Sequence, residues 1–168
     1  MKFEDITPTP DLYVLVGLPG SGKSTWTKNF LATADKPFVV VSTDDILERI
    51  AKENGSSYNE VINHSYGNAE KEMKRNATEA FHKGISVIWD QTNMGVNKRR
   101  KILSQTPKEY RKIAVLFELD EKELYNRLNK RAEETGKVIS PKIVEQMKEG
   151  YVEPTKAEGF DEIIKVKG

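Results

Sequence analysis

Short runs of Val, Ile and Leu alternate along the chain with longer segments whose apolar positions recur at helical spacing. Nearly continuous apolar runs of this length are typical of strands buried on both faces of a sheet. The runs predict strands over residues 12–16, 38–42, 85–90, 113–119 and 162–166. Their alternation with helical segments predicts an α/β fold with a five-stranded parallel sheet and helices on both faces.

The segments between the runs predict helices over residues 22–32, 44–53, 68–83, 96–104, 121–134 and 140–150. Start signals support two of them, because Asp120 precedes one, and Ser140 followed by Pro141 supplies a capping hydroxyl and then a proline at the other. The stretch "NGSSYNEVIN" predicts a turn and a short helix. The first ten residues predict a loose tail on a single domain that spans residues 1–168.

Composition narrows the class of protein. A chain of 168 residues that is 37% hydrophobic is expected to form one core. Without cysteine there is no disulfide, thiolate metal site or thiol nucleophile, which favours a cytoplasmic location. No run has membrane-spanning length, and no obligatory protein partner is evident. The net charge of +1 argues against binding polyanions by overall charge and leaves room for a local basic patch.

The stretch "VGLPGSGKSTW" fits the phosphate-binding motif G-x-x-x-x-G-K-[ST] between a predicted strand and a predicted helix. Backbone N–H groups of such a loop point at phosphate oxygens, and the next helix adds the positive end of its dipole. We expect ATP or another NTP, with Lys23 on the β- and γ-phosphates and Ser24 on Mg²⁺. The predicted contacts from the loop are Gly17, Pro19, Gly20, Ser21, Gly22, Lys23, Ser24 and Thr25. The alternative is a glycine-rich turn without a ligand.

Two aspartates follow predicted strands at the edge of the sheet where ligands bind. Asp44, in "VSTDDILERI", is placed to accept a proton from an attacking hydroxyl, and a helix cap formed by Ser42 or Asp44 is the alternative. Asp90, in "VIWDQTN", is placed to hold the water shell of Mg²⁺ or to orient a neighbouring group. An Asx-turn is its alternative.

Cations cluster in two predicted helices. In "NKRRKIL" the cations 98–101 form either a solvated face or part of the rim of the site. Arg127 and Arg131 lie four residues apart, so both project from one helix face and suit a lid that closes on triphosphate oxygens. Ordinary surface pairs with Glu123 and Glu134 are the alternative. The stretch "EETGK" behind them predicts a mobile hinge.

From about Leu12 to Val166 the chain resembles the kinase domain of the polynucleotide 5'-hydroxyl kinases of bacteriophages and of animals. The resemblance lies in the phosphate-binding stretch, the aspartate after the second strand, "WDQTN", the arginine-bearing helix and the closing "YVEPTKAEGFDEIIKV". The resemblance implies a compact P-loop kinase fold, ATP and Mg²⁺ as donor, and a nucleic-acid 5'-OH end as acceptor. It further implies Lys23 and Ser24 as phosphate and metal residues, Asp44 as general base, Asp90 as a necessary acid, and Arg131, helped by Arg127, as the lid residue.

Contacts to the acceptor are expected from Thr43, Asp90 and Arg99. In the phage enzymes an arginine precedes the catalytic aspartate and another follows it three positions later, where this chain has Thr43 and Leu47. Three alternatives remain open: a kinase of a hydroxymethylated base within DNA, a small-metabolite kinase, and a nucleotide-dependent binding module without acceptor chemistry.

Overall fold

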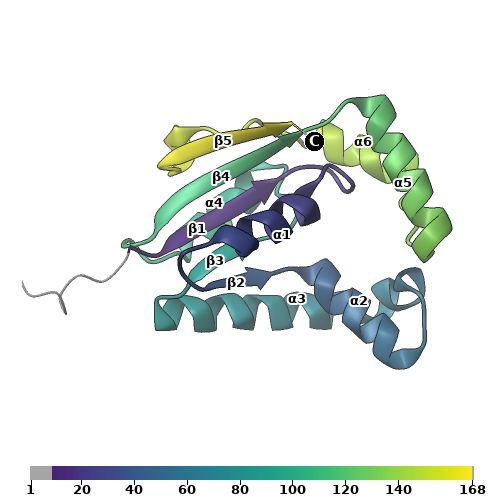
Figure 1. Cartoon of the computed structure of the whole chain (residues 1–168), viewed down its shortest axis with the longest axis horizontal. Helices are drawn as coiled ribbons and strands as arrows, with labels where there is room; N and C mark the ends of the chain where they lie inside the picture. Colours follow the sequence, from purple (N-terminus) through teal and green to yellow (C-terminus); the bar gives the residue numbers. More distant parts are fainter. Residues whose placement is uncertain (1–8, 168) are drawn as a thin grey trace, which may run out of the picture.

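Five parallel strands form one sheet in the computed structural model, which describes residues 9–167 (Figure 1). The strands are β1 (Asp11–Val16), β2 (Phe38–Val41), β3 (Ser86–Trp89), β4 (Arg111–Glu118) and β5 (Glu162–Lys167). Their order is β2-β3-β1-β4-β5, and all four neighbouring pairs are parallel. The sequence-based prediction of an α/β fold with five parallel strands is therefore confirmed. Most of the predicted loose tail, residues 1–8, lies outside the described residues.

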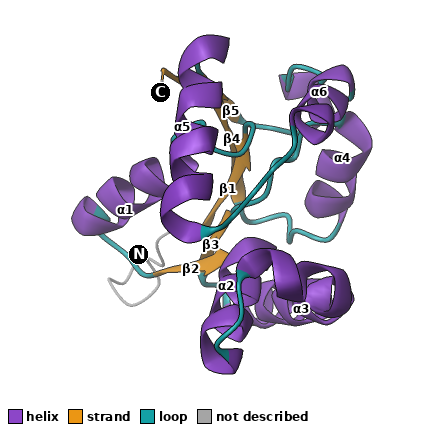
Figure 2. Ribbon diagram, turned by 90° about the vertical axis from the view of Figure 1, so that its right-hand side faces the viewer, coloured by secondary structure: helices purple, strands orange, loops and turns teal. Residues whose placement is uncertain are grey.

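Helices cover both faces of this sheet, as Figure 2 shows with the sheet nearly on edge. They are α1 (Lys23–Thr33), α2 (Thr43–Asn54), α3 (Tyr58–Lys83), α4 (Val96–Ser104), α5 (Glu121–Thr135) and α6 (Pro141–Glu149), with a 3-10 turn at Lys156–Glu158. The capping signals act as predicted, since Asp120 accepts from the amide of Glu123 and Ser140 accepts from that of Ile143. No helix within residues 9–167 combines the length and the apolar content needed to cross a bilayer.

The two faces of β1 supply two separate hydrophobic cores. Leu12, Val14 and Val16 pack with residues of α2, α3 and α4, whereas Tyr13 and Leu15 face the aromatic side chains of α1. This alternation is the period of two that a strand imposes on its side chains. The sheet is therefore covered on both sides, and its carboxyl edge remains available for a site.

A third cluster attaches α5 and α6 to that edge. Leu124 and Leu128 of α5 pack with Val144 of α6, and Leu18 of the phosphate-binding loop packs against them. Gly20 of the same loop has φ 81°, and a Cβ there would lie 3.1 Å from Leu128 Cδ2. The loop and α5 thus approach as closely as a glycine allows.

One helix differs from its prediction. The segment 54–63 was expected to be a turn and a short helix before a separate helix at 68–83, but α3 runs without a break over 26 residues. A capping box starts it early, because Ser57 accepts from the amide of Glu60 and the Glu60 carboxylate accepts from the amide of Ser57. Gly67 does not interrupt it. The added turns bring Tyr58 and Tyr66 to the carboxyl edge of the sheet.

Candidate active site

A cleft of 1120 Å³ lies at the carboxyl edge of the sheet, lined by the phosphate-binding loop, α2, the start of α3, the loop after β3, and the α5–α6 segment. In Figure 2, α1 and α5 flank one side of the sheet and α4 and α6 the other. Most of the predicted site residues line this cleft: Pro19, Gly20, Gly22, Lys23, Ser24, Thr25, Thr43, Asp44, Asp90, Arg127 and Arg131. Gly17 and Ser21 lie behind the loop surface, and Arg99 lies elsewhere.

The phosphate-binding loop is held by its own backbone and by Lys23. The Lys23 ammonium donates to the carbonyl of Gly17 over 2.9 Å. A Cβ on Gly17 would lie 2.7 Å from Ser21 Oγ, so this position admits only glycine without a shift. Burial lowers the pKa of Lys23 to about 8, although Asp90 and Asp44 act in the other direction. The lysine is therefore still cationic at neutral pH, as a phosphate contact requires.

Asp90 sits at the end of β3 with its carboxylate largely enclosed. Burial raises its pKa to about 6, while the nearby Lys23 opposes the rise. Among the hydrogen bonds of the described residues none reaches this carboxylate, so the Asx-turn alternative is not what the structure shows. The pKa of the neighbouring Asp45 is also raised, first by burial and then by Glu48 and Asp44.

The oxygens that face the loop fit a hard cation held partly by a nucleotide. Ser24 offers a hydroxyl and Asp90 a carboxylate to the same cleft. Residues 9–167 contain no group of three or more His, Cys, Asp or Glu side chains that would hold a metal ion by themselves. Mg²⁺ is usually bound in proteins by one or two carboxylates, waters and substrate phosphates, which is the donor set this edge provides.

Asp44 does not cap α2, because Ser42 does. The Ser42 hydroxyl accepts from the amide of Asp45 over 3.2 Å. The Asp44 side chain is instead 55% exposed in the cleft, where its Oδ1 accepts a hydrogen bond from the Tyr58 hydroxyl over 2.8 Å. Burial and the adjacent Asp44 raise the pKa of Tyr58, so its hydroxyl remains a donor. The carboxylate is thus free of the capping role.

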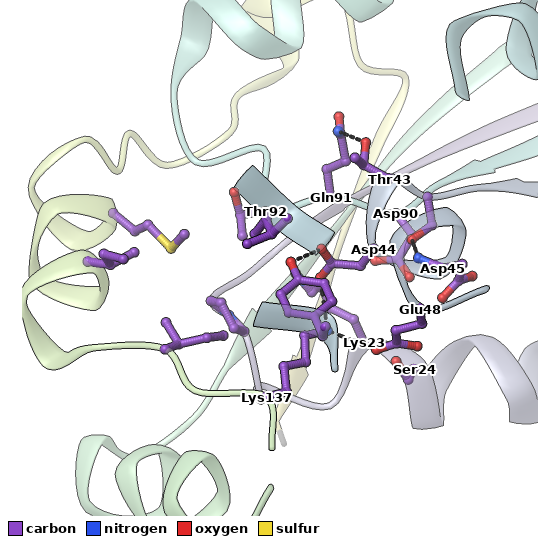
Figure 3. Close-up of a pocket in the computed structure, with 18 of the residues that line it drawn as sticks. Lys23, Ser24, Thr43, Asp44, Asp45, Glu48, Asp90, Gln91, Thr92 and Lys137 are labelled. Carbon is purple, nitrogen blue, oxygen red and sulfur yellow. Dashed lines mark hydrogen bonds and ion pairs between the residues drawn. The ribbon is translucent and has the colours of Figure 1, made fainter. Parts of the chain in front are cut away.

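Lys137 is a site residue that the sequence analysis missed. It follows α5 in the stretch predicted as a hinge, yet its side chain is only 4% exposed. Its ammonium lies 3.3 Å from Asp44 Oδ2 and 2.9 Å from Glu48 Oε1 (Figure 3). In the sequence it is a single lysine that follows a glycine. That glycine, Gly136, ends α5 with φ 72°.

The loop after β3 connects the cleft to the sheet. Thr43 is buried, accepts a hydrogen bond from Gln91 Nε2 over 2.8 Å and donates to Met73 Sδ, so its predicted contact with an acceptor stays a prediction (Figure 3). Asn93, at φ 49°, donates to the carbonyl of Leu15 over 2.8 Å. The amide of Gly17 donates to the carbonyl of Thr92 over 3.0 Å. The "DQTN" stretch therefore braces the phosphate-binding loop.

The two lid arginines of α5 differ in their contacts. Arg127 pairs with Glu123 at 3.1 Å, as the surface-pair alternative predicted, and it also approaches the carbonyl of Gly20 at 3.5 Å. The guanidinium of Arg131 has no hydrogen-bond or ion-pair partner among the described residues and lines the cleft. Arg131 is therefore the cation of this helix that is available to an incoming phosphate.

The prediction that Arg99 contacts the acceptor is wrong. Its side chain is 0% exposed and its nitrogens bond both carboxylate oxygens of Glu158 as well as the carbonyls of Asn93, Met94 and Val152. The C-terminal segment folds back over α4 and encloses it, which a reading of the local run of cations could not show. Lys98 is the member of that run that lines the cleft.

Comparison with known proteins agrees with this geometry. A family model described as AAA domain matches residues 12–154. The Arabidopsis thaliana protein named transcription factor bHLH140 is 23% identical over 154 residues, which are 90% of this chain and 15% of that protein. The chain therefore spans only a small part of this curated relative.

Solved structures repeat the fold. A chain of the Pnkp1/Rnl/Hen1 RNA repair complex is 28% identical with a TM-score of 0.67, over 88% of this chain and 45% of that one. A candidate kinase from Chloroflexus aurantiacus is 19% identical with a TM-score of 0.70, over 95% and 85%. A gluconokinase from Sinorhizobium meliloti is 18% identical with a TM-score of 0.56, over 96% and 84%. The chain is a nucleotide-binding domain of the P-loop kinase type.

Proposed function

The chain belongs to the AAA domain family, whose model matches residues 12–154, and we propose that it transfers the γ-phosphate of ATP to an alcohol, the 5'-hydroxyl end of a polynucleotide. The observation that carries the proposal is the position of Asp44. Its carboxylate is not used as a cap, is exposed in the cleft, and shares that cleft with Lys23 and Arg131. A base beside phosphate-binding cations is what phosphoryl transfer to an alcohol requires.

In the proposed reaction the acceptor hydroxyl gives its proton to the Asp44 carboxylate. The acceptor oxygen then forms a bond to the γ-phosphorus, and the bond to the oxygen that bridges the β- and γ-phosphorus breaks, so ADP leaves with the electron pair. Lys23 and Arg131 compensate the charge on the transferring group, since both are cations that line the cleft. Neither residue takes part in proton transfer.

The donor requires Mg²⁺ in this proposal, with Ser24 and, through water, Asp90 as its protein contacts. When bound, the ion offsets charge on the β- and γ-phosphates. Burial raises the pKa of Asp90, and a cation bound beside it would favour the ionised carboxylate. The lid residue Arg127 supports Arg131 from the same helix face and contacts the phosphate-binding loop.

A polynucleotide end is favoured by the part of the cleft lining that lies outside the phosphate-binding loop. That part of the cleft is lined by Lys98 and by aromatic and apolar side chains of α3 and α6. The latter are Tyr58, Ile62, Tyr66, Ile143 and Met147. Tyr66 and Ile143 are exposed, although both are large and apolar. Flat bases stack on such surfaces, and a cation beside them suits a phosphate of the strand.

A small polyhydroxylated acceptor is the second candidate. Four carboxylates line the cleft, Asp44, Asp45, Glu48 and Asp90, and carboxylates accept hydrogen bonds from several hydroxyls. They would also repel an anionic strand that approached them closely. This observation favours a neutral sugar or polyol as the acceptor, so sugars and polyols are included in the test below.

A panel of acceptors with ATP labelled at the γ-phosphate tests the proposal. The acceptors are DNA and RNA oligonucleotides with a 5'-OH, the same strands with a 5'-phosphate, 5'-phosphorylated DNA that contains a hydroxymethylated base, and a set of sugars and polyols. Label should enter only strands with a 5'-OH, and Lys23→Ala should show none above background. Label on the hydroxymethylated DNA or only on a sugar would overturn the assignment of the acceptor.

A further inference from the structure

We propose that Lys137 is a positioning residue that fixes the orientation of the Asp44 carboxylate toward the acceptor. The proposal rests on the proposed function, because it takes Asp44 as the general base. Lys137 belongs to the segment between α5 and α6, whereas Asp44 belongs to α2, and both line the cleft. The residues are 93 positions apart in the chain.

Both oxygens of Asp44 have assigned donors. Oδ1 accepts from the Tyr58 hydroxyl over 2.8 Å and Oδ2 accepts from the Lys137 ammonium over 3.3 Å. Two donors from different elements hold the plane of the carboxylate, which a single bond would leave free to rotate. Each oxygen accepts more than one hydrogen bond, so a lone pair remains for an acceptor hydroxyl.

The ammonium also resolves a repulsion within α2. Asp44 and Glu48 are four residues apart, so their carboxylates share one face of the helix. The Lys137 ammonium lies between them, and it is also 4.4 Å from the centre of the Tyr58 ring. These contacts enclose it almost completely. A cation brought here from another segment keeps Asp44 in place beside Glu48 where repulsion would otherwise turn it away.

Attachment of the segment does not by itself explain a buried lysine. Next to it, the Val138 amide donates to Asn59 Oδ1 over 2.9 Å, and Asn59 Nδ2 donates to the Val138 carbonyl over 3.0 Å. This pair of bonds joins the segment to α3 without Lys137. Enclosing an ammonium costs solvation, and its ion pairs must offset that cost. The lysine thus adds a contact at Asp44 beyond what attachment needs.

The test compares Lys137→Met, Lys137→Arg and Asn59→Ala with the wild-type chain. Lys137→Met removes the charge and the donors at similar length, Lys137→Arg restores them, and Asn59→Ala removes only the attachment at Val138. The measurements are the melting temperature, the Kd for ATP, and kcat and KM for transfer to a 5'-OH oligonucleotide. If Lys137→Met does not fold, Lys137→Gln takes its place.

We expect Lys137→Met to lower kcat about 10- to 100-fold, the scale at which loss of alignment acts, with the Kd for ATP and the KM for the oligonucleotide within about twofold of wild type. Lys137→Arg should recover most of kcat, and Asn59→Ala should lower the melting temperature while kcat stays within about twofold. An unchanged kcat in Lys137→Met with a lowered melting temperature would make Lys137 an attachment only. A weakened Kd for ATP with unchanged kcat would make it a donor contact, and both results overturn the proposal.

ATP hydrolysis, measured without an acceptor, separates failure of this proposal from failure of the proposed function. If wild type transfers no phosphate to a 5'-OH oligonucleotide, the proposed function is overturned. The hydrolysis rate then decides on Lys137, since water takes the place of the alcohol beside Asp44. Lys137→Met should again be slower than wild type and Asn59→Ala should not. Equal rates in wild type and Lys137→Met would overturn the positioning role.

Discussion

Nε of Arg99 in α4 lies 2.8 Å from Oε1 of Glu158 in the C-terminal 3-10 turn, and both side chains are buried. The pair joins two segments 59 positions apart, and the same guanidinium also bonds three backbone carbonyls. A buried ion pair with every donor used costs little while it is complete and much when one partner is removed. Arg99 is therefore a structural residue.

Replacement of Arg99 should destabilise the fold. Arg99→Met leaves the Glu158 carboxylate buried without its partner, so the free energy of unfolding should fall by about 3–5 kcal/mol. Urea unfolding followed by circular dichroism measures it. Arg100→Met, at an exposed position next to it, is the matched control and should stay within about 0.5 kcal/mol of wild type. A loss below about 1 kcal/mol in Arg99→Met would contradict the structural role.

Asp44→Asn should abolish most transfer while it leaves the fold intact. Asparagine keeps the size of aspartate and one acceptor oxygen without its basicity, so transfer to a 5'-OH oligonucleotide should fall about 10²- to 10⁴-fold. ATP affinity should change little. The melting temperature should fall only modestly, because Ser42 supplies the cap and Lys137 keeps its ion pair with Glu48. Full activity would remove Asp44 from the mechanism and leave Asp45 or Asp90 as the base to test.

Arg131→Ala should slow turnover without changing stability. Its guanidinium has no hydrogen-bond or ion-pair partner among residues 9–167, so its loss breaks no such bond there, whereas a transferring phosphate loses a compensating charge. We expect kcat/KM to fall about 10-fold or more with the melting temperature unchanged. Lys130→Ala, the neighbouring exposed cation, should behave as wild type. A lower melting temperature with unchanged turnover per folded molecule would mark Arg131 as structural.

The stability of the chain should depend on pH through Asp90. Its pKa is raised from 3.8 to about 6, so between these pH values the Asp90 carboxyl is protonated in the folded chain and ionised in the unfolded chain. The stability that this proton confers is complete below pH 3.8 and is lost as the pH rises through about 6. Asp90→Asn should therefore melt above wild type at pH 8, by a margin that shrinks toward pH 4, measured with EDTA and without nucleotide. A margin that is the same at every pH would contradict the shift.

The strands and the donor half of the site could be predicted because their signals are local. Apolar runs identify the five strands, and the glycine spacing identifies the loop that carries Lys23. Parallel order then places Asp44 and Asp90 at one edge. The remaining features depend on contacts between segments far apart in the sequence: Lys137 pairs with Asp44 and Glu48 of α2, and Arg99 pairs with Glu158 of the C-terminal segment. No local pattern distinguishes these cations from solvated ones.

Asn93 donates to the carbonyl of Leu15 in β1, and Thr92 accepts from the amide of Gly17 at the start of the phosphate-binding loop. These bonds give the two parts of the site a different tolerance to change. The start of the phosphate-binding loop is joined to the central strand, so substitutions at Gly17 or Asn93 would disturb the sheet itself. The acceptor part consists of Ile62 and Tyr66 of α3 and Ile143 and Met147 of α6, whose side chains can vary without loss of the nucleotide contacts. Under the proposed function, a fold divided in this way can acquire a new acceptor by exchange of a few surface positions. Structural neighbours named for an RNA repair complex and as a gluconokinase share its fold.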